Sequence, residues 1–161
     1  MATLILQDTY QILEKELKSI DEKMKDLGVK IKDARELGDL KENAEYHAAR
    51  EEMSLTIYKK QKLSSHAPFT MIEDDEIETD EVEFGNKVMI HEEDKDKPEE
   101  YYILGPLELE LDLYPMIATY HSPFAQAVIG KKVDESFTLE IKGKKTKFTV
   151  VSIEMIPAKW K

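Results

Sequence analysis

The sequence of 161 residues contains no cysteine. A disulfide framework and a thiolate metal site are therefore excluded, and we expect a cytoplasmic protein, because disulfides are rare in that compartment. No apolar run approaches the roughly 20 residues that a helix needs to cross a bilayer, so we expect no membrane association. The opening residues, MATLILQDTY, lack the basic leader and the longer apolar run of a signal peptide.

Sequence motifs of self-sufficient enzymes are also missing. No HExxH, P-loop, GxGxxG or GxSxG pattern occurs in the chain. The four histidines have no metal-ligand spacing among them: His47, His66, His91 and His121. An active site would need a base with a nucleophile, or a closed metal site, and the sequence supplies neither.

Charge of one sign dominates only part of the chain. The net charge is −11, with 35% charged and 41% hydrophobic residues, which is typical of a folded, soluble protein. Residues 1–66 hold 12 Lys and Arg against 13 Asp and Glu, whereas residues 67–161 hold 11 against 21. The acidic second half should repel duplex phosphate, so we do not expect it to bind DNA on its own.

The first half carries the heptad pattern of a coiled coil. Its apolar residues alternate spacings of three and four: Tyr10, Leu13, Leu17, Ile20, Met24, Leu27, Ile31 and Ala34. The pattern stops at Gly38, which can adopt positive φ and end a helix. A second helix is expected from about Leu40 to about Leu63.

The second helix has a looser pattern, and its apolar stripe toward the first helix (the seam) is predicted at Leu40, Ala44, Ala48, Leu55 and Tyr58. The short reversal at 37–39 predicts an antiparallel pair. About 30 residues at roughly 1.5 Å each would make a rod of about 45 Å with the reversal at its tip. Because such a hairpin covers its own seam, we expect a monomer.

The second half changes to the period-two pattern of strands. Strands are predicted at 82–90, 99–105, 136–142 and 147–156, and one short helix at 122–130. The acidic stretch EDDEIETDEVE (73–83) is interpreted as a solvated linker. The predicted fold class is α+β: an antiparallel coiled-coil hairpin over 1–68, an acidic linker over 69–83 and a small α+β domain over 84–161.

Two acids beside the tip, Asp39 and Glu42, allow two interpretations. Asp39 as N-cap and Glu42 three residues later would form a capping box for the second helix. Capping does not explain the basic residues near them, which are Arg35, Lys41 and Arg50. A rod with acids at its tip and arginines on its shaft is suited to entering a channel, where the acids would hold a divalent cation and the arginines would contact phosphates.

The metal interpretation requires ligands from elsewhere. On a helix, residues three apart lie about 5–6 Å from each other at Cβ, near enough to share one ion. Mg²⁺ commonly binds through one or two carboxylates and keeps several waters, so two acids alone make a weak site. Such a site would function only with a partner's ligands.

The stretch GDLKENAEYHAARE (38–51) resembles the signature of the GreA/GreB transcript cleavage factors of bacterial RNA polymerase. SPFAQAVIGKKVDE (122–135) and KFTVVSIE (147–154) resemble the C-terminal domain of the same family. The chain is more similar to the GreA branch, since its shaft is not extensively basic. The resemblance implies an FKBP-like fold for the second domain.

The resemblance also implies a function. Family members dock at the secondary channel of the polymerase and insert the hairpin, which stimulates endonucleolytic cleavage of backtracked RNA and rescues arrested complexes. Asp39 and Glu42 match the acids that help to hold a second Mg²⁺, shared with the polymerase, and a water. Arg35 and Arg50 match the arginines that contact the extruded RNA 3′ end. The factor itself would bind no metal alone and would not be an enzyme.

Other positions in the matched stretches have a second explanation each. Lys41, Asn43 and Tyr46 support the tip or serve only in helix initiation and packing. Ser122 and Pro123 match a position associated with polymerase docking, although capping of a short helix also explains them.

Three alternatives to a cleavage factor remain. An inhibitory paralogue would occlude the channel, but such members alter the tip acids, which are intact here. A prolyl isomerase or chaperone would need an aromatic-lined cleft, for which eight residues are available: Phe84, Tyr101, Tyr102, Tyr114, Tyr120, Phe124, Phe137 and Phe148. A plain coiled-coil adaptor would tolerate replacement of Asp39 and Glu42.

Overall fold

The computed structural model describes residues 2–38 and 43–156, which fall into two compact units. The hairpin unit is Gln11–Ala67, and the sheet unit combines the residues up to Tyr10 with those from Pro68 onward. The predicted class is confirmed, because a helical hairpin is followed by an α+β domain. The boundaries differ from the predicted ones, since the first ten residues belong with the second domain.

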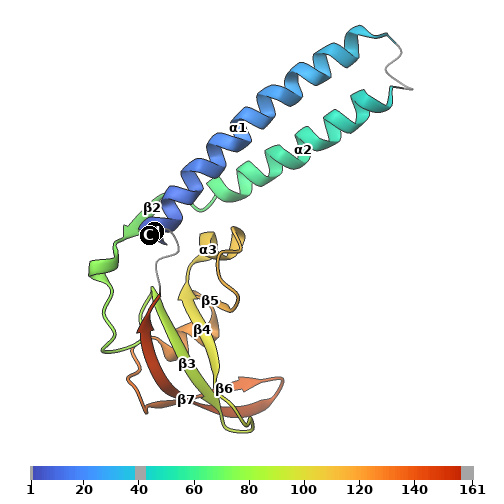
Figure 1. The fold of residues 1–161 in the computed structure, drawn as a ribbon. Helices are drawn as coiled ribbons and strands as arrows, with labels where there is room; N and C mark the ends of the chain where they lie inside the picture. The colour runs from blue at the N-terminus through green and yellow to red at the C-terminus, as the bar shows by residue number, and fades with distance from the viewer. Residues whose placement is uncertain (1, 39–42, 157–161) are drawn as a thin grey trace. The chain divides into compact units, whose positions relative to one another are not determined.

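The hairpin unit consists of two long antiparallel helices (Figure 1). Helix α1 spans Gln7–Glu36, with its first turn in the sheet unit, and α2 spans Ala44–Ser64. Lys60 of α2 pairs with Asp21 of α1 at 2.6 Å. Ion pairs between the helices contribute little stability each, so burial along the seam holds the helices together.

The seam of α1 is the predicted one. Buried residues recur every seven positions, at Leu13, Ile20, Leu27 and Ala34. Half-buried residues alternate with them at Tyr10, Leu17, Met24 and Ile31. The heptad therefore predicted the buried face of this helix correctly.

The predicted seam of α2 is wrong. Of the residues assigned to it, Ala44, Ala48, Leu55 and Tyr58 are exposed, and Leu40 lies outside the described residues. The observed seam again alternates spacings of three and four, through Tyr46, Ala49, Met53, Thr56, Lys60 and Leu63. This seam includes the polar residues Thr56 and Lys60, whereas the apolar residues Leu55 and Tyr58 are exposed on another face. A prediction from hydrophobicity alone therefore chose the wrong face of α2.

The sheet unit begins with a small parallel sheet that the sequence did not predict. Strand β1 (Thr3–Leu6) pairs with β2 (Phe69–Ile72), and a single 3-10 turn, η1 (Asp74–Glu76), follows. Val82 has no exposed surface. The predicted linker over 69–83 is therefore a structured part of the sheet unit.

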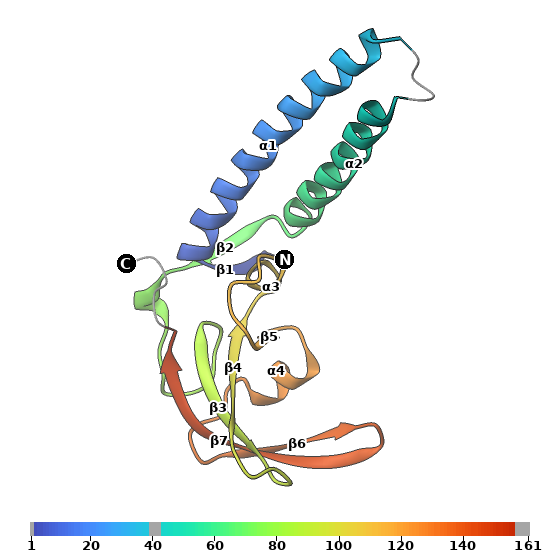
Figure 2. The same cartoon turned by 45° about the vertical axis from the view of Figure 1, so that its right-hand side comes forward.

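A five-stranded sheet forms the main body of the sheet unit, in the order β5-β4-β3-β7-β6 (Figure 2). Its strands are β3 (Asn86–Glu92), β4 (Glu99–Leu104), β5 (Ile117–Thr119), β6 (Ser136–Ile141) and β7 (Lys144–Met155). Four of them correspond to predicted strands. Strand β5 and the short helix α3 (Pro106–Glu110) were not predicted.

The predicted short helix is α4 (Pro123–Val128), and it packs against the sheet. The Ser122 hydroxyl accepts a hydrogen bond from the amide of Ala125 at 3.2 Å, so Ser122 is the expected cap. Gly130 follows with a φ of +90°, which favours glycine. The core beneath α4 is apolar and joins Ala125, Val128, Val88, Ile90, Ile103, Phe137, Phe148 and Val150.

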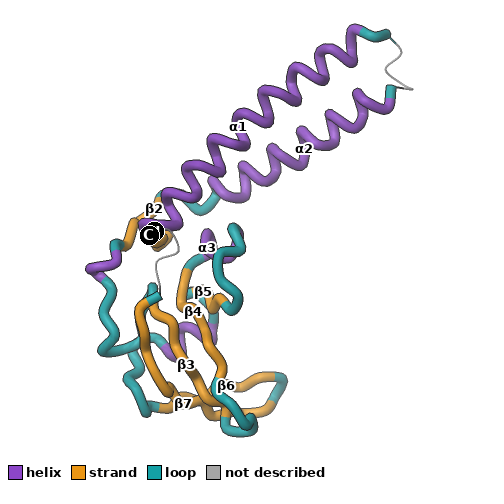
Figure 3. The backbone as a smooth tube through the Cα atoms, in the orientation of Figure 1, coloured by secondary structure: helices purple, strands orange, loops and turns teal. Residues whose placement is uncertain are grey.

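Strands and loops make up most of the sheet unit, and helical segments are short there (Figure 3). Across residues 2–38 and 43–156, none of the helices is long and apolar enough to cross a membrane.

Candidate functional site

The end of α1 fixes one side of the hairpin turn. The amide of Leu37 donates to the carbonyl of Ala34 at 3.2 Å, and that of Gly38 donates to Arg35 at 3.4 Å. Gly38 has a φ of +109°, so a side chain here would be strained. The predicted helix end at Gly38 is confirmed.

Asn43 fixes the other side of the turn. Its Oδ1 accepts from the amide of Tyr46 at 3.1 Å, which makes it the N-cap of α2. Its Nδ2 donates to the carbonyl of Ala34 at 2.9 Å. One side chain therefore caps the second helix and ties it to the end of the first.

The predicted capping box is wrong, because α2 begins at Ala44 and takes its cap from Asn43. Asp39, Lys41 and Glu42 lie outside the described residues. The N-cap of α2 is Asn43 and neither Asp39 nor Glu42.

The two predicted arginines meet at one tyrosine. Nη1 of Arg50 donates to the hydroxyl of Tyr46 at 3.4 Å, and the Arg50 Cζ lies 5.6 Å from the centre of the Tyr46 ring. Arg35, on the other helix, also hydrogen-bonds the Tyr46 hydroxyl. The arrangement brings two guanidinium groups from α1 and α2 to the same face of the hairpin.

The tyrosine responds electrostatically to both arginines. Its pKa is lowered below the ordinary value, chiefly by the hydrogen bond from Arg35 and further by Arg50, while burial acts in the opposite direction. Tyr46 is itself buried in the seam, whereas both arginines are exposed. The Tyr46 hydroxyl therefore contacts both guanidinium groups on their protein-facing side, and their exposed sides remain accessible to an anion.

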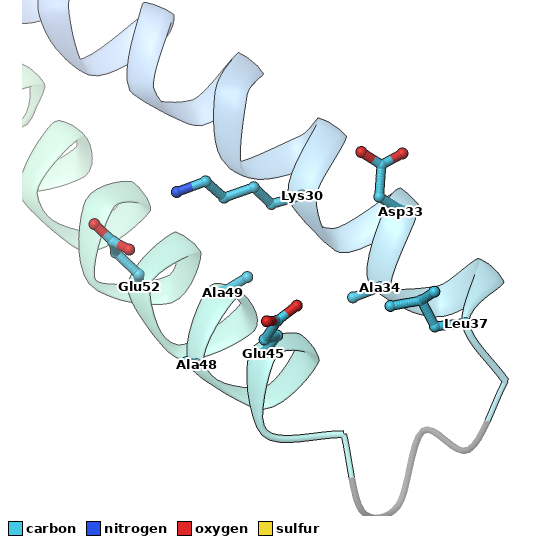
Figure 4. Close-up of a pocket in the computed structure, with 8 residues that line it drawn as sticks. All are labelled: Lys30, Asp33, Ala34, Leu37, Glu45, Ala48, Ala49 and Glu52. Carbon is cyan, nitrogen blue, oxygen red and sulfur yellow. The ribbon is translucent and has the colours of Figure 1, made fainter.

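A depression of about 480 Å³ lies between the helices near the turn (Figure 4). Its lining comes from both sides of the hairpin: Lys30, Asp33 and Ala34 of α1 with Leu37 just after it, and Glu45, Ala48, Ala49 and Glu52 of α2. The sequence did not predict this depression. No three acidic or histidine side chains group as metal ligands there or elsewhere within residues 2–38 and 43–156.

A second candidate surface lies in the sheet unit. A groove of about 410 Å³ is bordered by Ser122, so this residue contributes to a surface as well as capping α4. Leu109 and Met116 line the groove and are 53% and 47% exposed. These two residues come from the segment whose fold the sequence did not predict, so the sequence analysis did not single them out. Pro123 occupies the first position of α4.

The aromatic residues of the sheet unit serve mostly in packing. Phe84, Tyr120, Phe137 and Phe148 are buried. Tyr101 and Phe124 line the groove, with ring centres 4.7 Å apart. A prolyl isomerase activity stays a prediction that only an assay can test.

The fold and the site define a two-part protein, with paired arginines on a helical hairpin and an exposed apolar groove on an α+β domain. Two family models match it: one described as "Transcription elongation factor, N-terminal" over residues 3–66, and one described as "Transcription elongation factor, GreA/GreB, C-term" over residues 77–155. The chain belongs to the GreA/GreB family of transcription elongation factors.

Individual relatives agree with the family models. The chain is 35% identical to transcription elongation factor GreA of Novosphingobium aromaticivorans, over 94% of this chain and 95% of that protein. It is 38% identical to GreA of Nautilia profundicola, over 83% of each chain. Among solved structures, GreA factor homolog 1 of Thermus thermophilus aligns with a TM-score of 0.46 and 18% identity, covering 96% of this chain and 99% of that one.

Proposed function

We propose that this chain binds bacterial RNA polymerase and stimulates the polymerase's own endonucleolytic cleavage of backtracked nascent RNA, which rescues arrested complexes. Family membership supports the partner. The cleavage role is supported mainly by the N-cap of α2. Because Asn43 caps this helix, helix capping does not explain the presence of Asp39 and Glu42 in the sequence. The chain would act as a cytoplasmic monomer and would not be an enzyme by itself.

Asp39 and Glu42 are the proposed metal ligands. Carboxylate oxygens are the donors that Mg²⁺ prefers, so the donor chemistry fits, and two donors are too few for a site that works alone. The remaining ligands would come from the polymerase. When bound, the ion would lower the pKa of a coordinated water and stabilise negative charge that develops on the phosphate. Lys41, between the two acids in the sequence, would add a positive charge to the same site.

Arg35 and Arg50 are proposed to bind the RNA 3′ segment. Guanidinium groups pair with phosphate oxygens through two parallel hydrogen bonds, and they keep their charge at any physiological pH. The Tyr46 hydroxyl restrains both groups before RNA arrives. This restraint would lower the entropy lost on binding and would fix the scissile phosphate near the acids.

The groove beside Ser122 is the proposed docking surface on the polymerase. Exposed Leu109 and Met116 supply apolar area, and the Ser122–Pro123 corner supplies a rigid rim. Such an exposed apolar patch with a polar rim is typical of a protein-binding surface. The inhibitory alternative shares this docking step, so only RNA cleavage separates the two functions.

A backtracked elongation complex with 5′-labelled RNA and Mg²⁺ tests the proposal. We expect the native protein to shorten the RNA, and an Asp39→Asn, Glu42→Gln double variant to bind the polymerase without shortening it. A matched double variant on the α1 shaft, Glu22→Gln with Asp26→Asn, loses the same charge and should retain cleavage. If native protein binds but does not cleave, the chain occludes the channel and the proposal is wrong.

A further inference from the structure

The depression of about 480 Å³ between α1 and α2 has no part in the proposed function (Figure 4). It exists because the seam becomes small near the turn. The buried seam residues of α1 farther from the turn include Ile20 and Leu27, whereas the last one is Ala34. Ala49 of α2 is buried in the same seam. Both alanines line the depression, so they form an apolar floor in the space that larger side chains would fill.

The depression and the arginine pair lie on opposite flanks of the hairpin. Arg35 and Arg50 each follow a buried seam alanine by one residue. Asp33 and Ala48, which line the depression, each precede one. Consecutive residues of a helix point about 100° apart, so residues before and after a seam position face opposite sides. The hairpin near its turn therefore has an arginine flank and, behind it, a depression flank.

The rim of the depression carries unneutralised negative charge. Three of its lining residues are acids, and one of these, Glu52, pairs with Lys23 at 3.1 Å. The other two, Asp33 and Glu45, are exposed and form no ion pair with any of residues 2–38 and 43–156. Against them stands one ammonium group in the lining, that of Lys30. The rim thus keeps an excess of carboxylate beside an apolar floor.

This chemistry fits a lysine or arginine side chain from another protein. Such a side chain places an apolar stem on apolar surface and keeps its charged end in a polar place. A carboxylate that accepts from a guanidinium or ammonium group forms a charge-assisted hydrogen bond. A nucleic acid is a poor occupant, because the rim carboxylates would repel its phosphates.

We propose that the depression receives a lysine or arginine side chain of RNA polymerase, with its stem on Ala48 and Ala49 and its cationic end beside Asp33 and Glu45. The inference rests on the proposed function, which supplies the polymerase as partner. A hairpin that enters a channel with its arginines toward RNA turns the opposite flank toward the channel wall. The two flanks then have different tasks: one binds RNA, and the other fixes the hairpin to protein.

Filling the depression tests its use in polymerase binding. Ala48→Trp occupies it from an exposed position and leaves the seam unchanged, so we expect binding to purified polymerase to weaken by about tenfold or more. Val29→Trp is the matched control, because Val29 is exposed on α1 and does not line the depression. Competition with a labelled native factor measures both affinities, and circular dichroism confirms both folds.

Removing the rim charges tests the chemistry of the occupant. An Asp33→Asn, Glu45→Gln variant should bind about fivefold more weakly at low salt, and the difference from native protein should shrink as salt is raised. A defect in folding or shape would persist at high salt. The Glu22→Gln, Glu51→Gln variant loses the same charge at exposed positions outside the depression and should bind like native protein.

The outcomes separate this inference from the proposed function. If native protein binds and cleaves, and the filling and charge variants bind equally well, the inference is wrong and the proposed function stands. If native protein does not bind polymerase, both are wrong.

Cross-linking identifies the occupant directly. The chain has no cysteine, so a Leu37→Cys variant accepts a single benzophenone label at the rim, where Leu37 is 74% exposed. In the polymerase complex we expect the label to capture a polymerase peptide that contains lysine or arginine, and the same label at Val29→Cys not to capture that peptide. Capture of RNA or of a second copy of the chain in place of polymerase would overturn the inference.

Discussion

The guanidinium of Arg50 lies over the ring of Tyr46, with Cζ 5.6 Å from the ring centre, and Nη1 donates to the phenol oxygen at 3.4 Å. Arg35 reaches the same oxygen from the opposing helix. The hydroxyl is thus a shared acceptor for two cations that belong to different helices. Phosphate binding by the hairpin depends on this arrangement in our account.

Tyr46→Phe should lower RNA cleavage while leaving the hairpin folded, because the ring still fills the seam but the arginines lose their shared acceptor. The lost hydrogen bonds should cost about 1 kcal/mol of unfolding free energy. Cleavage of a backtracked complex and urea unfolding measure the two effects. Tyr58→Phe, at an exposed position of α2, is the matched control and should change neither. Unchanged cleavage in Tyr46→Phe would contradict a role of the Tyr46 hydroxyl in positioning the two arginines.

Arg35→Gln should raise the Tyr46 pKa toward its ordinary value, because the hydrogen bond from Arg35 is the main cause of the lowered pKa. Ultraviolet absorbance of the phenolate during a pH titration reports this change, with a Tyr46→Phe variant subtracted to isolate one tyrosine. A titration that does not move would mean that the two side chains do not meet in solution.

Leu63→Ala and Leu55→Ala test the observed seam of α2. Leu63 is buried, and its truncation should cost about 2–5 kcal/mol of unfolding free energy. Leu55 is 64% exposed, so its truncation should stay within about 0.5 kcal/mol. Urea unfolding of both variants gives the comparison. The reverse ranking would restore the seam predicted from hydrophobicity.

Glu108 should make stability depend on pH. It is fully buried in α3, its Oε1 accepts from the amide of Gly105 at 3.0 Å, and burial raises its pKa from 4.5 to about 7. The folded state therefore holds a proton that the unfolded state has already released above pH 4.5. The stabilisation is complete below that value and is lost as pH rises through 7, by about 3 kcal/mol in all.

Glu108→Gln should abolish that part of the pH dependence, since the amide cannot ionise. Urea unfolding at about pH 5 and about pH 8 measures it. The exposed Glu140→Gln variant should keep the native dependence. A native protein with equal stability at both pH values would contradict the assignment.

Met116→Glu should weaken polymerase binding by about tenfold or more, because it places a charge in the apolar groove that we propose as the docking surface. Competition with a labelled native factor measures the affinity. Val151→Glu introduces the same charge at another exposed apolar position and should bind normally, since Val151 does not line the groove. Equal losses in both variants would argue against a specific role for the groove.

Hydrophobic periodicity predicted the seam of α1 correctly and the seam of α2 wrongly, for a physical reason. The α1 seam is apolar throughout, so its heptad was visible, and Gly38 marked its end. The α2 seam includes Thr56, whose hydroxyl is satisfied by the carbonyl of Glu52 at 2.8 Å, and Lys60, whose charge pairs with Asp21. Local pairing of this kind makes polar residues acceptable in a seam, and a hydrophobic pattern cannot show it.

Helix ends were predictable where the residues that cap a helix lie next to one another in the sequence. Ser122, Pro123 and Gly130 marked both ends of α4 correctly. At α2, the sequence suggested Asp39 as the cap, whereas the observed cap is Asn43, which also bonds to the carbonyl of Ala34. That long-range bond favours Asn43 as the cap, and the sequence gives no sign of it.

Long-range pairing accounts for the largest errors in the sheet unit. Strand β1 pairs with β2 across more than 60 intervening residues, and its four residues look like the start of α1. The charge of the acidic stretch predicts a solvated linker, whereas Ile77 and Val82 of this stretch are buried in the core. Two apolar residues among eight acids were enough to fix a segment whose composition is typical of a linker.

The dependence of RNA cleavage on Mg²⁺ concentration tests the central claim most directly. The measurement compares native protein with the Asp39→Asn, Glu42→Gln variant at saturating concentration on the same backtracked complex. Our account predicts that the variant needs more Mg²⁺ and cleaves more slowly, because the shared ion has lost two ligands. Coincident rates and coincident Mg²⁺ dependence would contradict a metal-binding role for these two acids.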